Sequence, residues 1–324
     1  MQTEIEIKFL VADPALGDPA DSMANKLDIF LNSLTVVDHS EVELGNIYFD
    51  TRDLALRRLD MGLRIRRSND FAEQTIKCRG EGLGGLHARP EYNGPVRGEL
   101  PCLADFPATI WPQGEDLAAL QAALVPQFRT DFLRRHWLIA WEGAEIELAW
   151  DRGEIVGQEG REAIDELELE LKRGSAAALL TLAESLGAMP GLRLGVQSKA
   201  QRGYRLAGLG KALVARPLPQ RGDLDGLSPR QQIALGLEQW QHHEQICVLQ
   251  QDMAAWPDLV AGLALIAQAL EHSVAMGEPA PEWSKEIAPL LAELAQLDEA
   301  GRRRWLARAD YVVLQLAIIA WLRQ

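Results

Sequence analysis

The chain has 324 residues, of which 47% are hydrophobic and 25% are charged, and its formal net charge is −14. This length favours two domains of ordinary globular composition, and the acidic balance argues against nucleic acid as a partner, because phosphate backbones attract basic surfaces. The three cysteines, Cys78, Cys102 and Cys247, are odd in number and far apart, which excludes a disulfide framework or a thiolate metal site and indicates a reducing compartment.

The predicted elements begin with an alternating segment, Glu4-Ile5-Glu6-Ile7-Lys8. A strand has a side-chain period of two, so Glu4, Glu6 and Lys8 share one face and the isoleucines share the other. Taken alone, a charged strand face usually meets solvent. Because this strand starts so close to the N-terminus, we expect no signal peptide and a cytoplasmic location.

The alternation recurs along the next two hundred residues. After a predicted helix from about Asp21 to Leu34, strands are expected at 36–49, 61–67, 71–79, 87–97, 130–142, 144–157 and 163–172. An insert with helical character, punctuated by proline and glycine, is predicted at about 101–125. A further helix should run from Ser175 to Leu186, after Gly174 and before Gly187.

The charges on these strands suggest a closed barrel with a polar interior. The clearest strand runs from Asp165 to Leu171, with three glutamates on one face and three leucines on the other. Strands of this kind can close so that the charged faces line a lumen and the apolar faces pack against helices. Enclosed charges need partners, so acids and bases must interleave or bind ions. Cations such as Arg64 and Lys199 are expected to repel one another across an empty lumen.

The last third of the chain is predicted to be helical. Residues 208–227 are rich in glycine, proline and arginine, which indicates a linker. We therefore predict domains at 1–207 and 228–324, with helices near 228–253, 257–276, 282–297 and 299–322 in the second. The longest apolar stretch, Tyr311 to Leu322, is too short to span a bilayer, so a buried helix and no membrane partner are expected.

Residues 1 to about 208 resemble a CYTH domain of the triphosphate tunnel metalloenzymes, whose signature is Glu-x-Glu-x-Lys, here Glu4 to Lys8. The resemblance is close to bacterial inorganic triphosphatases in which a helical CHAD domain follows. The other segments that carry it are 46–51, 61–66, 85–93, 130–134, 166–171 and 198–204. It implies an α+β fold, in which a closed antiparallel eight-stranded β-barrel tunnel with outer helices precedes an all-α, CHAD-like domain.

The resemblance also implies divalent-metal-dependent hydrolysis of tripolyphosphate to diphosphate and phosphate. Magnesium and manganese suit such a site because they prefer oxygen ligands. The implied metal ligands are Glu4, Glu6, Glu168 and Glu170, with Asp151 as a helper. Arginine forks and lysine point charges suit a linear phosphate anion. The implied phosphate-binding residues are Lys8, Arg64, Arg66, Lys77, Arg89, Arg134, Lys199 and Arg202.

Several further roles are less specific. Tyr48 and Lys77 match a pair that handles the leaving group or water in related enzymes, although a core tyrosine beside a phosphate-binding lysine explains them equally well. We expect Glu145 and Glu147 in the tunnel wall and Glu166 at its mouth. His87, in a glycine-rich turn, could reach the substrate, although a loop histidine is more often solvated or structural.

Two other functions stay open. The same tunnel could act on an organic triphosphate, such as thiamine triphosphate, a nucleotide, or ATP in cyclisation to cyclic AMP. A non-catalytic polyphosphate-binding protein could instead use the helical tail, but acidic residues outnumber basic ones in 222–324. His242 and His243 are adjacent, hence about 100° apart on a helix, which favours packing or surface roles over a metal pair. The oligomeric state cannot be predicted.

Overall fold

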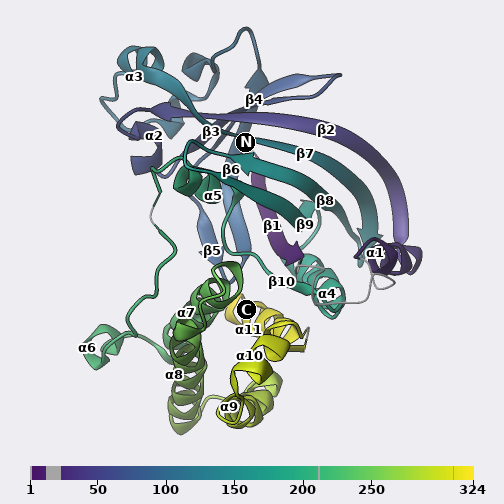
Figure 1. The fold of residues 1–324 in the computed structure, drawn as a ribbon, viewed down its shortest axis with the longest axis vertical. Coiled ribbons are helices and arrows are strands. Elements are labelled where there is room, and N and C mark those ends of the chain that lie inside the picture. Colours follow the sequence, from purple (N-terminus) through teal and green to yellow (C-terminus); the bar gives the residue numbers. More distant parts are fainter. Residues whose placement is uncertain (1, 12–22, 211, 309) are drawn as a thin grey trace.

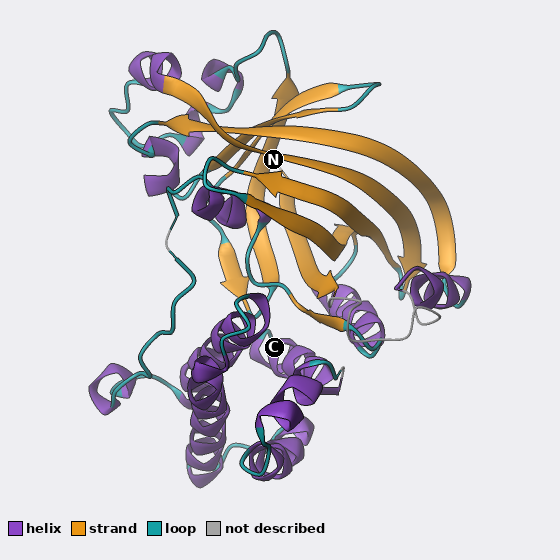
Figure 2. Ribbon diagram, viewed as in Figure 1, coloured by secondary structure: helices purple, strands orange, loops and turns teal. Residues whose placement is uncertain are grey.

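The computed structural model describes residues 2–11, 23–210, 212–308 and 310–324. A β-barrel built from the N-terminal two thirds lies beside a helical region built from the C-terminal third (Figure 1). Figure 2 shows that the long strands belong to the barrel and that the C-terminal region is helical throughout.

Eight antiparallel strands close into the predicted barrel, in the order β1-β9-β8-β7-β2-β3-β4-β6, with β6 returning to β1. Their bounds are β1 (Gln2–Val11), β2 (Thr35–Thr51), β3 (Gly62–Arg67), β4 (Ala72–Lys77), β6 (Leu86–Pro95), β7 (Leu124–Trp141), β8 (Ala144–Val156) and β9 (Arg161–Arg173). Two strands of three residues, β5 (Glu81–Leu83) and β10 (Leu192–Leu194), extend β6 and β1. Neither was predicted, because so short a run has no detectable period.

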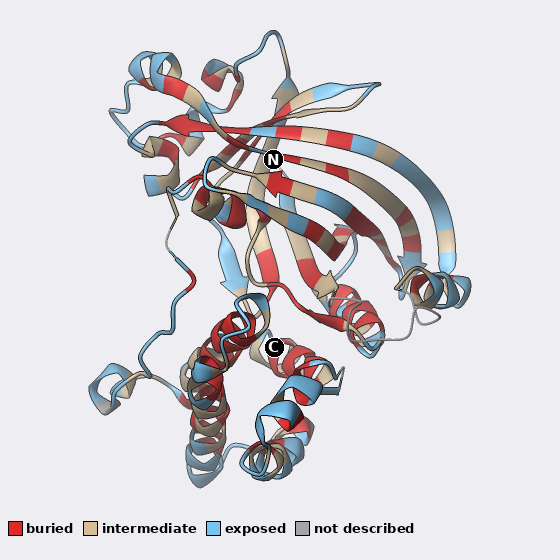
Figure 3. Cartoon of the chain, viewed as in Figure 1, coloured by how far each residue is buried: buried red, intermediate tan, exposed pale blue. Residues whose placement is uncertain are grey.

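The apolar strand faces form the outer core, as the alternation predicted. Ile7 and Phe9 of β1 are fully buried in a cluster with residues of α4 (Ala176–Gly187) and α1 (Met23–Asn32). The predicted start of the first helix at Asp21 lies outside the described residues. Buried and exposed positions alternate along the barrel strands (Figure 3).

The insert covers the outside of strands β2 to β4. It consists of two 3-10 turns, η3 (Leu103–Asp105) and η4 (Ala108–Ile110), followed by α3 (Leu117–Ala123). Its side chains bury Leu63 and Ile76 in a second apolar cluster. The helical insert is therefore confirmed, although β7 follows it directly and begins earlier than predicted.

A short helix that the periodicity did not reveal, α5 (Lys199–Leu206), lies at one end of the barrel. Ser198 and Gln201 cap its start reciprocally, with hydrogen bonds of 3.2 and 2.9 Å. The Tyr204 ring meets Phe128 edge-on at 5.1 Å. Ser-x-x-Gln is the sequence signature of a capping box, so the start of this helix could have been predicted from it.

The helical region contains α6 (Arg221–Leu224), α7 (Pro229–Leu249), η5 (Met253–Ala255), α8 (Trp256–Ala275), η6 (Glu282–Glu286), α9 (Ile287–Leu294), α10 (Glu299–Leu306) and α11 (Asp310–Leu322). The predicted last helix is thus divided into α10 and α11. As expected, the apolar stretch of α11 is buried, with Val312 and Ile319 fully covered. By length and composition the segment Met253–Ala275 could cross a membrane, but half of its apolar window is buried inside the protein.

The helical region and the barrel share one apolar core. A single cluster contains Phe9 of β1 together with Leu237 of α7 and Ile319 of α11. The turn between β5 and β6 is part of this contact: Gln241 donates to the Gly84 carbonyl at 3.1 Å. Gly84 has φ +60°, and a Cβ there would lie 2.7 Å from Ile319, so glycine is required on both counts.

Side chains of α7 hold part of the linker. His242 Nε2 lies 2.7 Å from the Val214 carbonyl, and the Arg216 N–H donates to His243 Nε2 at 3.1 Å. Gln239 donates to the Arg216 carbonyl at 3.2 Å. The adjacent histidines therefore have the predicted packing role.

Candidate active site

The barrel lumen is a cavity of about 600 Å³ lined by charged side chains from every side. The acids and bases interleave, as predicted for enclosed charges. The basic lining residues among those described are Lys8, Arg57, Arg64, Arg66, Lys77, Arg89, Arg134, Lys172 and Lys199; the acidic ones are Glu4, Glu6, Asp60, Glu73, Glu91, Glu147, Glu168 and Glu170.

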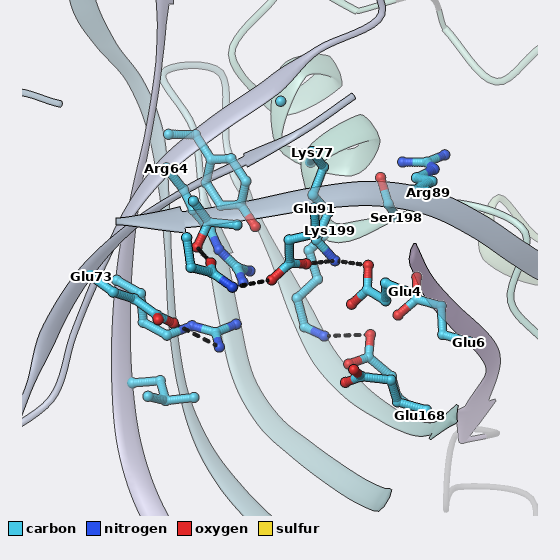
Figure 4. A pocket seen from close by; sticks show the side chains of 18 of the residues that line it. Glu4, Glu6, Arg64, Glu73, Lys77, Arg89, Glu91, Glu168, Ser198 and Lys199 are labelled. Atoms are coloured by element: carbon cyan, nitrogen blue, oxygen red, sulfur yellow. Dashed lines mark hydrogen bonds and ion pairs between the residues drawn. The ribbon is translucent and has the colours of Figure 1, made fainter. Parts of the chain in front are cut away.

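The structure brings most of the predicted site residues together in this cavity. Those that line it are Glu4, Glu6, Lys8, Tyr48, Arg64, Arg66, Lys77, Arg89, Arg134, Glu168, Glu170 and Lys199. Figure 4 shows Glu4, Glu6 and Glu168 gathered on one side, with Arg64 and Glu73 on the other. Asp151 and Arg202 do not line the cavity.

One side of the lumen is a dense network of ion pairs, which we call the paired wall: Lys8, Arg134, Asp151, Glu166, Glu168, Lys199 and Arg202. Lys199 contacts Asp151, Glu166 and Glu168 at 2.7, 2.5 and 3.0 Å. Lys8 contacts Glu166 and Glu168 at 2.8 and 2.6 Å. Burial alone would lower the pKa of Lys8, but these two carboxylates raise it well above its usual value. The expected repulsion of Lys199 is therefore wrong, because this ammonium is surrounded by carboxylates.

The same network explains why two predicted residues are not in the cavity. Asp151 is fully buried and accepts two hydrogen bonds of 2.7 Å from Arg134. Arg202 is turned toward Glu162 and Glu166, at 2.6 and 2.7 Å. A direct metal contact by Asp151 or a phosphate contact by Arg202 does not agree with these positions.

Glu166 is also in a different place from the one expected. Its exposed fraction is 0%, so it lies behind the lumen rather than at a tunnel mouth. Carboxylate oxygens of Asp151, Glu166 and Glu168 come within 4.8 Å of one another, a spacing that could hold a cation. Three basic residues, Lys8, Arg134 and Lys199, already neutralise this group. It is an ion-pair centre.

The other side of the lumen carries Arg64 and Arg66 on β3, which we call the arginine wall. Arg66 donates to Asn46 at 3.0 Å and lies 3.7 Å from Glu73. Burial, together with the nearby charges of Arg64 and Arg134, lowers the pKa of Arg66 to about 10. The Nε of Arg64 is buried without a hydrogen-bond partner among the described residues. The charges of Glu91 and Glu4 partly balance Arg64, and Glu73 partly balances Arg66. Among the described residues no carboxylate oxygen lies closer than 3.7 Å to either guanidinium, so an anion could still neutralise positive charge here.

Lys77 lies between the two walls and is held by two carboxylates. It forms a short ion pair with Glu4 and a second one with Glu91 at 3.2 Å. Burial raises the pKa of Glu4 to about 7 despite this ammonium. Burial would also raise the pKa of Glu91, but Lys77 and Arg64 lower it to about 2.

Tyr48 and Lys77 are not neighbours by strand register. Tyr48 lies opposite Arg64, whereas Lys77 lies opposite Gly62. The Tyr48 ring stacks on Phe128 with centroids 4.5 Å apart. Tyr48 thus has the packing expected of a core tyrosine while one face of it borders the cavity.

The carboxylates that could hold a metal lie in a row on neighbouring strands. Glu6 of β1 is opposite Glu170 of β9, which is opposite Glu147 of β8. Glu170 is 2.8 Å from Lys172, and Glu6 forms no ion pair with any described residue. Oxygen donors without a full complement of cations fit Mg²⁺ or Mn²⁺.

Some lining residues were not anticipated. Glu91, Lys172 and the helix-start residues Ser198 and Gln201 all border the cavity. Lys172 is two residues beyond Glu170, so the period of two could have identified it. Glu147 lies in the wall as expected, whereas Glu145 is paired with exposed Arg173.

His87 does not reach the cavity lining. Its exposed fraction is 8%, and burial lowers its pKa to about 4. It lies in β6, in agreement with the strand expected at 87–97, and not in the glycine-rich turn. This histidine is therefore neutral and buried beside the lumen.

Sequence comparison identifies one matching family. The CYTH domain matches residues 2–204. An inorganic triphosphatase of Haemophilus influenzae is 36% identical over 207 residues, which cover 64% of this chain and 55% of that protein. The chain thus spans about half the length of this curated relative.

Solved structures show weaker similarity. HpAC1 from Hippeastrum, named for adenylyl cyclase but with a dominant triphosphatase activity, has a TM-score of 0.41 and 17% identity over 62% of this chain and 95% of that chain. A protein from Pyrococcus horikoshii OT3 has a TM-score of 0.37 and 15% identity over 60% of this chain and 94% of its own.

Proposed function

The chain belongs to the CYTH family, and from this premise we propose that it is an inorganic triphosphatase that hydrolyses tripolyphosphate to diphosphate and phosphate with Mg²⁺ or Mn²⁺. The observation that supports this best is the division of the lumen. Two arginines that no described carboxylate oxygen approaches closer than 3.7 Å face a row of carboxylates across a cavity of about 600 Å³. A small, densely charged polyanion would neutralise the arginines, and a divalent cation would neutralise the carboxylates.

The arginine wall would bind the substrate. Arg64 and Arg66 present guanidinium groups to the cavity from one strand, two residues apart and on the same face. Planar guanidinium forks bind phosphate oxygens in pairs, and Arg89 would add a further cation from β6. Burial is the main cause of the lowered pKa of Arg66, and anion binding would relieve the added repulsion from Arg64 and Arg134.

Glu6 and Glu170, with Glu4 beside them, would hold the metal, and Glu168 would remain mainly in the paired wall. When bound, a divalent ion would neutralise negative charge on the phosphoryl oxygens. Lys77, kept protonated by Glu91 and Glu4, would hold the phosphate chain near these carboxylates. A water oxygen would form a bond to a terminal phosphorus while the bridging P–O bond breaks. The orthophosphate formed would keep one proton of the water, the other would pass to the departing diphosphate oxygen or to solvent, and diphosphate would leave.

The paired wall would keep this geometry fixed. Its charges already satisfy one another, so it needs no ligand to be stable, and it orients Lys8 and Lys199 at the cavity surface. Preorganised charges lower the barrier because they need not rearrange during the reaction.

Phosphate release from tripolyphosphate, ATP and thiamine triphosphate, each with and without Mg²⁺ or Mn²⁺, tests the proposal. We expect tripolyphosphate to be hydrolysed fastest and only with metal. Glu6→Gln should abolish turnover without unfolding the protein, because Glu6 has no ion pair to lose; exposed Glu43→Gln on β2 is the matched control. Preference for an organic triphosphate would favour the alternative enzyme, and binding without turnover would favour a polyphosphate-binding protein.

We propose a CYTH unit at 1–207, a linker at 208–227 and a CHAD-like helical unit at 228–324, in a cytoplasmic protein. The helical unit is acidic, so it should not bind long polyphosphate tightly at physiological salt. Limited proteolysis within 217–227, followed by separation of the fragments, tests whether the units are independent despite their shared core.

A further inference from the structure

A chain of hydrogen bonds runs along the lumenal faces of β4 and β6 and ends at Lys77. Thr75 Oγ1 donates to Asn93 Oδ1 at 2.7 Å, and Asn93 Nδ2 donates to Glu91 Oε1 at 3.0 Å. The other oxygen of Glu91, Oε2, meets Lys77 Nζ at 3.2 Å (Figure 4). Each oxygen of the Glu91 carboxylate thus has one donor.

The chain has one direction, because the ionised carboxylate of Glu91 can only accept. It requires the Nδ2 group of Asn93, since the reversed amide would place two acceptors against each other. The Asn93 oxygen then faces Thr75, which is fully buried and supplies its hydroxyl proton. Asn93 itself is exposed and borders the cavity. Its side chain is therefore held by these two hydrogen bonds rather than by packing.

Arg64 is the next cation that acts on Glu91. It lies opposite Thr75, which lies opposite Asn93, so these side chains share the lumenal face with Glu91. Burial would raise the pKa of Glu91, whereas Lys77 and, after it, Arg64 lower it. Arg64 nevertheless forms no ion pair with any described residue. The carboxylate is held toward Lys77 and away from this guanidinium.

We propose that Asn93 is a positioning residue that keeps the Glu91 carboxylate away from Arg64, so that this guanidinium stays available to a phosphate group of the substrate. The inference rests on the proposed function, since Arg64 belongs to the arginine wall. Without the Asn93 amide, Glu91 Oε1 would lose its donor, and the neighbouring guanidinium could supply one. Such an internal ion pair would compete with the polyanion for Arg64.

Tripolyphosphate binding by the full chain, measured by titration calorimetry in metal-free buffer, tests the inference apart from catalysis. Asn93→Ala should weaken binding about tenfold, since coupling within one hydrogen-bond network corresponds to about 2–150-fold in affinity. Asn69→Ala is the matched control, because Asn69 is also exposed but lies between β3 and β4, outside the cavity lining. With Mg²⁺ or Mn²⁺ present, Asn93→Ala should raise KM more than it lowers kcat.

A second substitution separates positioning from a general loss of structure. In a protein that already carries Glu91→Gln, no carboxylate at this position can occupy Arg64. Adding Asn93→Ala to it should therefore change the affinity by less than about twofold, which is the usual error of additivity. A structural defect would instead weaken binding equally in both backgrounds.

If Asn93→Ala does not fold, two variants of Thr75 give the same test, because serine keeps the hydroxyl that holds the amide and valine does not. Thr75→Val should bind tripolyphosphate more weakly than Thr75→Ser. Unchanged affinity in Asn93→Ala, an equal loss in the Glu91→Gln background, or equal binding by the two Thr75 variants would overturn the inference alone. Failure of wild type to bind tripolyphosphate would overturn the substrate-binding step of the proposed function as well.

Discussion

The two sides of the lumen contain the same kinds of basic residue in opposite electrostatic situations. In the paired wall, Lys199 meets three carboxylates within 3.0 Å. In the arginine wall, Arg66 has one amide oxygen at 3.0 Å and a carboxylate at 3.7 Å. Basic residues that look equivalent in the sequence are thus structural on one side and available to a ligand on the other.

The difference arises from which strands are neighbours. The acids at 166, 168 and 170 are on β9, which lies between β1 and β8. Cations from β1, β7 and α5 reach the acids at 166 and 168, which completes the paired wall, whereas Glu170 pairs with Lys172 of its own strand. The neighbours of β3 are β2 and β4, which oppose Arg66 with Asn46 and Glu73. The arginine wall therefore keeps its charge.

The largest expected effect comes from breaking the paired wall. Lys199→Met keeps the side-chain volume but leaves fully buried Asp151 and Glu166 short of a cation. Loss of one partner from a buried ion pair costs about 3–5 kcal/mol. We therefore expect the free energy of unfolding, measured in guanidinium titrations, to decrease by about this amount. Arg89→Met is the control, since Arg89 forms no ion pair with a described residue. Equal effects of both changes would contradict the distinction between the walls.

The next effect concerns ligand binding. Arg66→Met should leave the free energy of unfolding unchanged or slightly higher, because it removes repulsion from Arg64 and Arg134. The same change should weaken tripolyphosphate binding about 10–100-fold, since hydrogen bonds to charged groups contribute about 1.5–3 kcal/mol. Titration calorimetry measures the binding, and exposed Arg129→Met serves as control. Wild-type affinity in Arg66→Met would show that the arginine wall is not the anion site.

Glu91→Gln tests the residue that joins the two sides. It removes one of the two carboxylates around Lys77. Because Glu4 remains, we expect the free energy of unfolding at pH 7 to decrease by only about 1–2 kcal/mol. Because the pKa of Glu91 is lowered from 4.5 to about 2, its stabilisation is present above pH 4.5 and is lost as the pH falls to about 2. The stability difference between wild type and Glu91→Gln should therefore shrink across this window. A difference that stays constant from pH 7 to pH 2 would rule out the ion pair as its cause.

The smallest effect is stabilisation by a simple anion. Inorganic sulfate at a concentration equal to its Kd should stabilise the wild type by about 0.4 kcal/mol, by mass action. A thermal melt detects this as a small rise in Tm, which should vanish in Arg66→Met and decrease with added sodium chloride. An equal rise in both proteins would place the bound anion elsewhere.

Much of the barrel could be predicted from local pattern. The period of two along β1 and β9 identified the lumenal faces, and the same face supplied Glu4, Glu6, Glu168 and Glu170. Prediction failed where no period could form, as in the three-residue β5 and β10. It also failed for α5, whose capping box was the only local signal.

The sequence by itself determined which side chains share a strand face, because backbone geometry alternates them without regard to the rest of the molecule. Only the tertiary structure decided which acid meets which base. Lys8 and Glu166 are 158 residues apart in sequence and 2.8 Å apart in space. Closure of the barrel joins β1 to both β6 and β9, which places Glu6 between His87 and Glu170. Strand order and register set these contacts, and no local pattern encodes either.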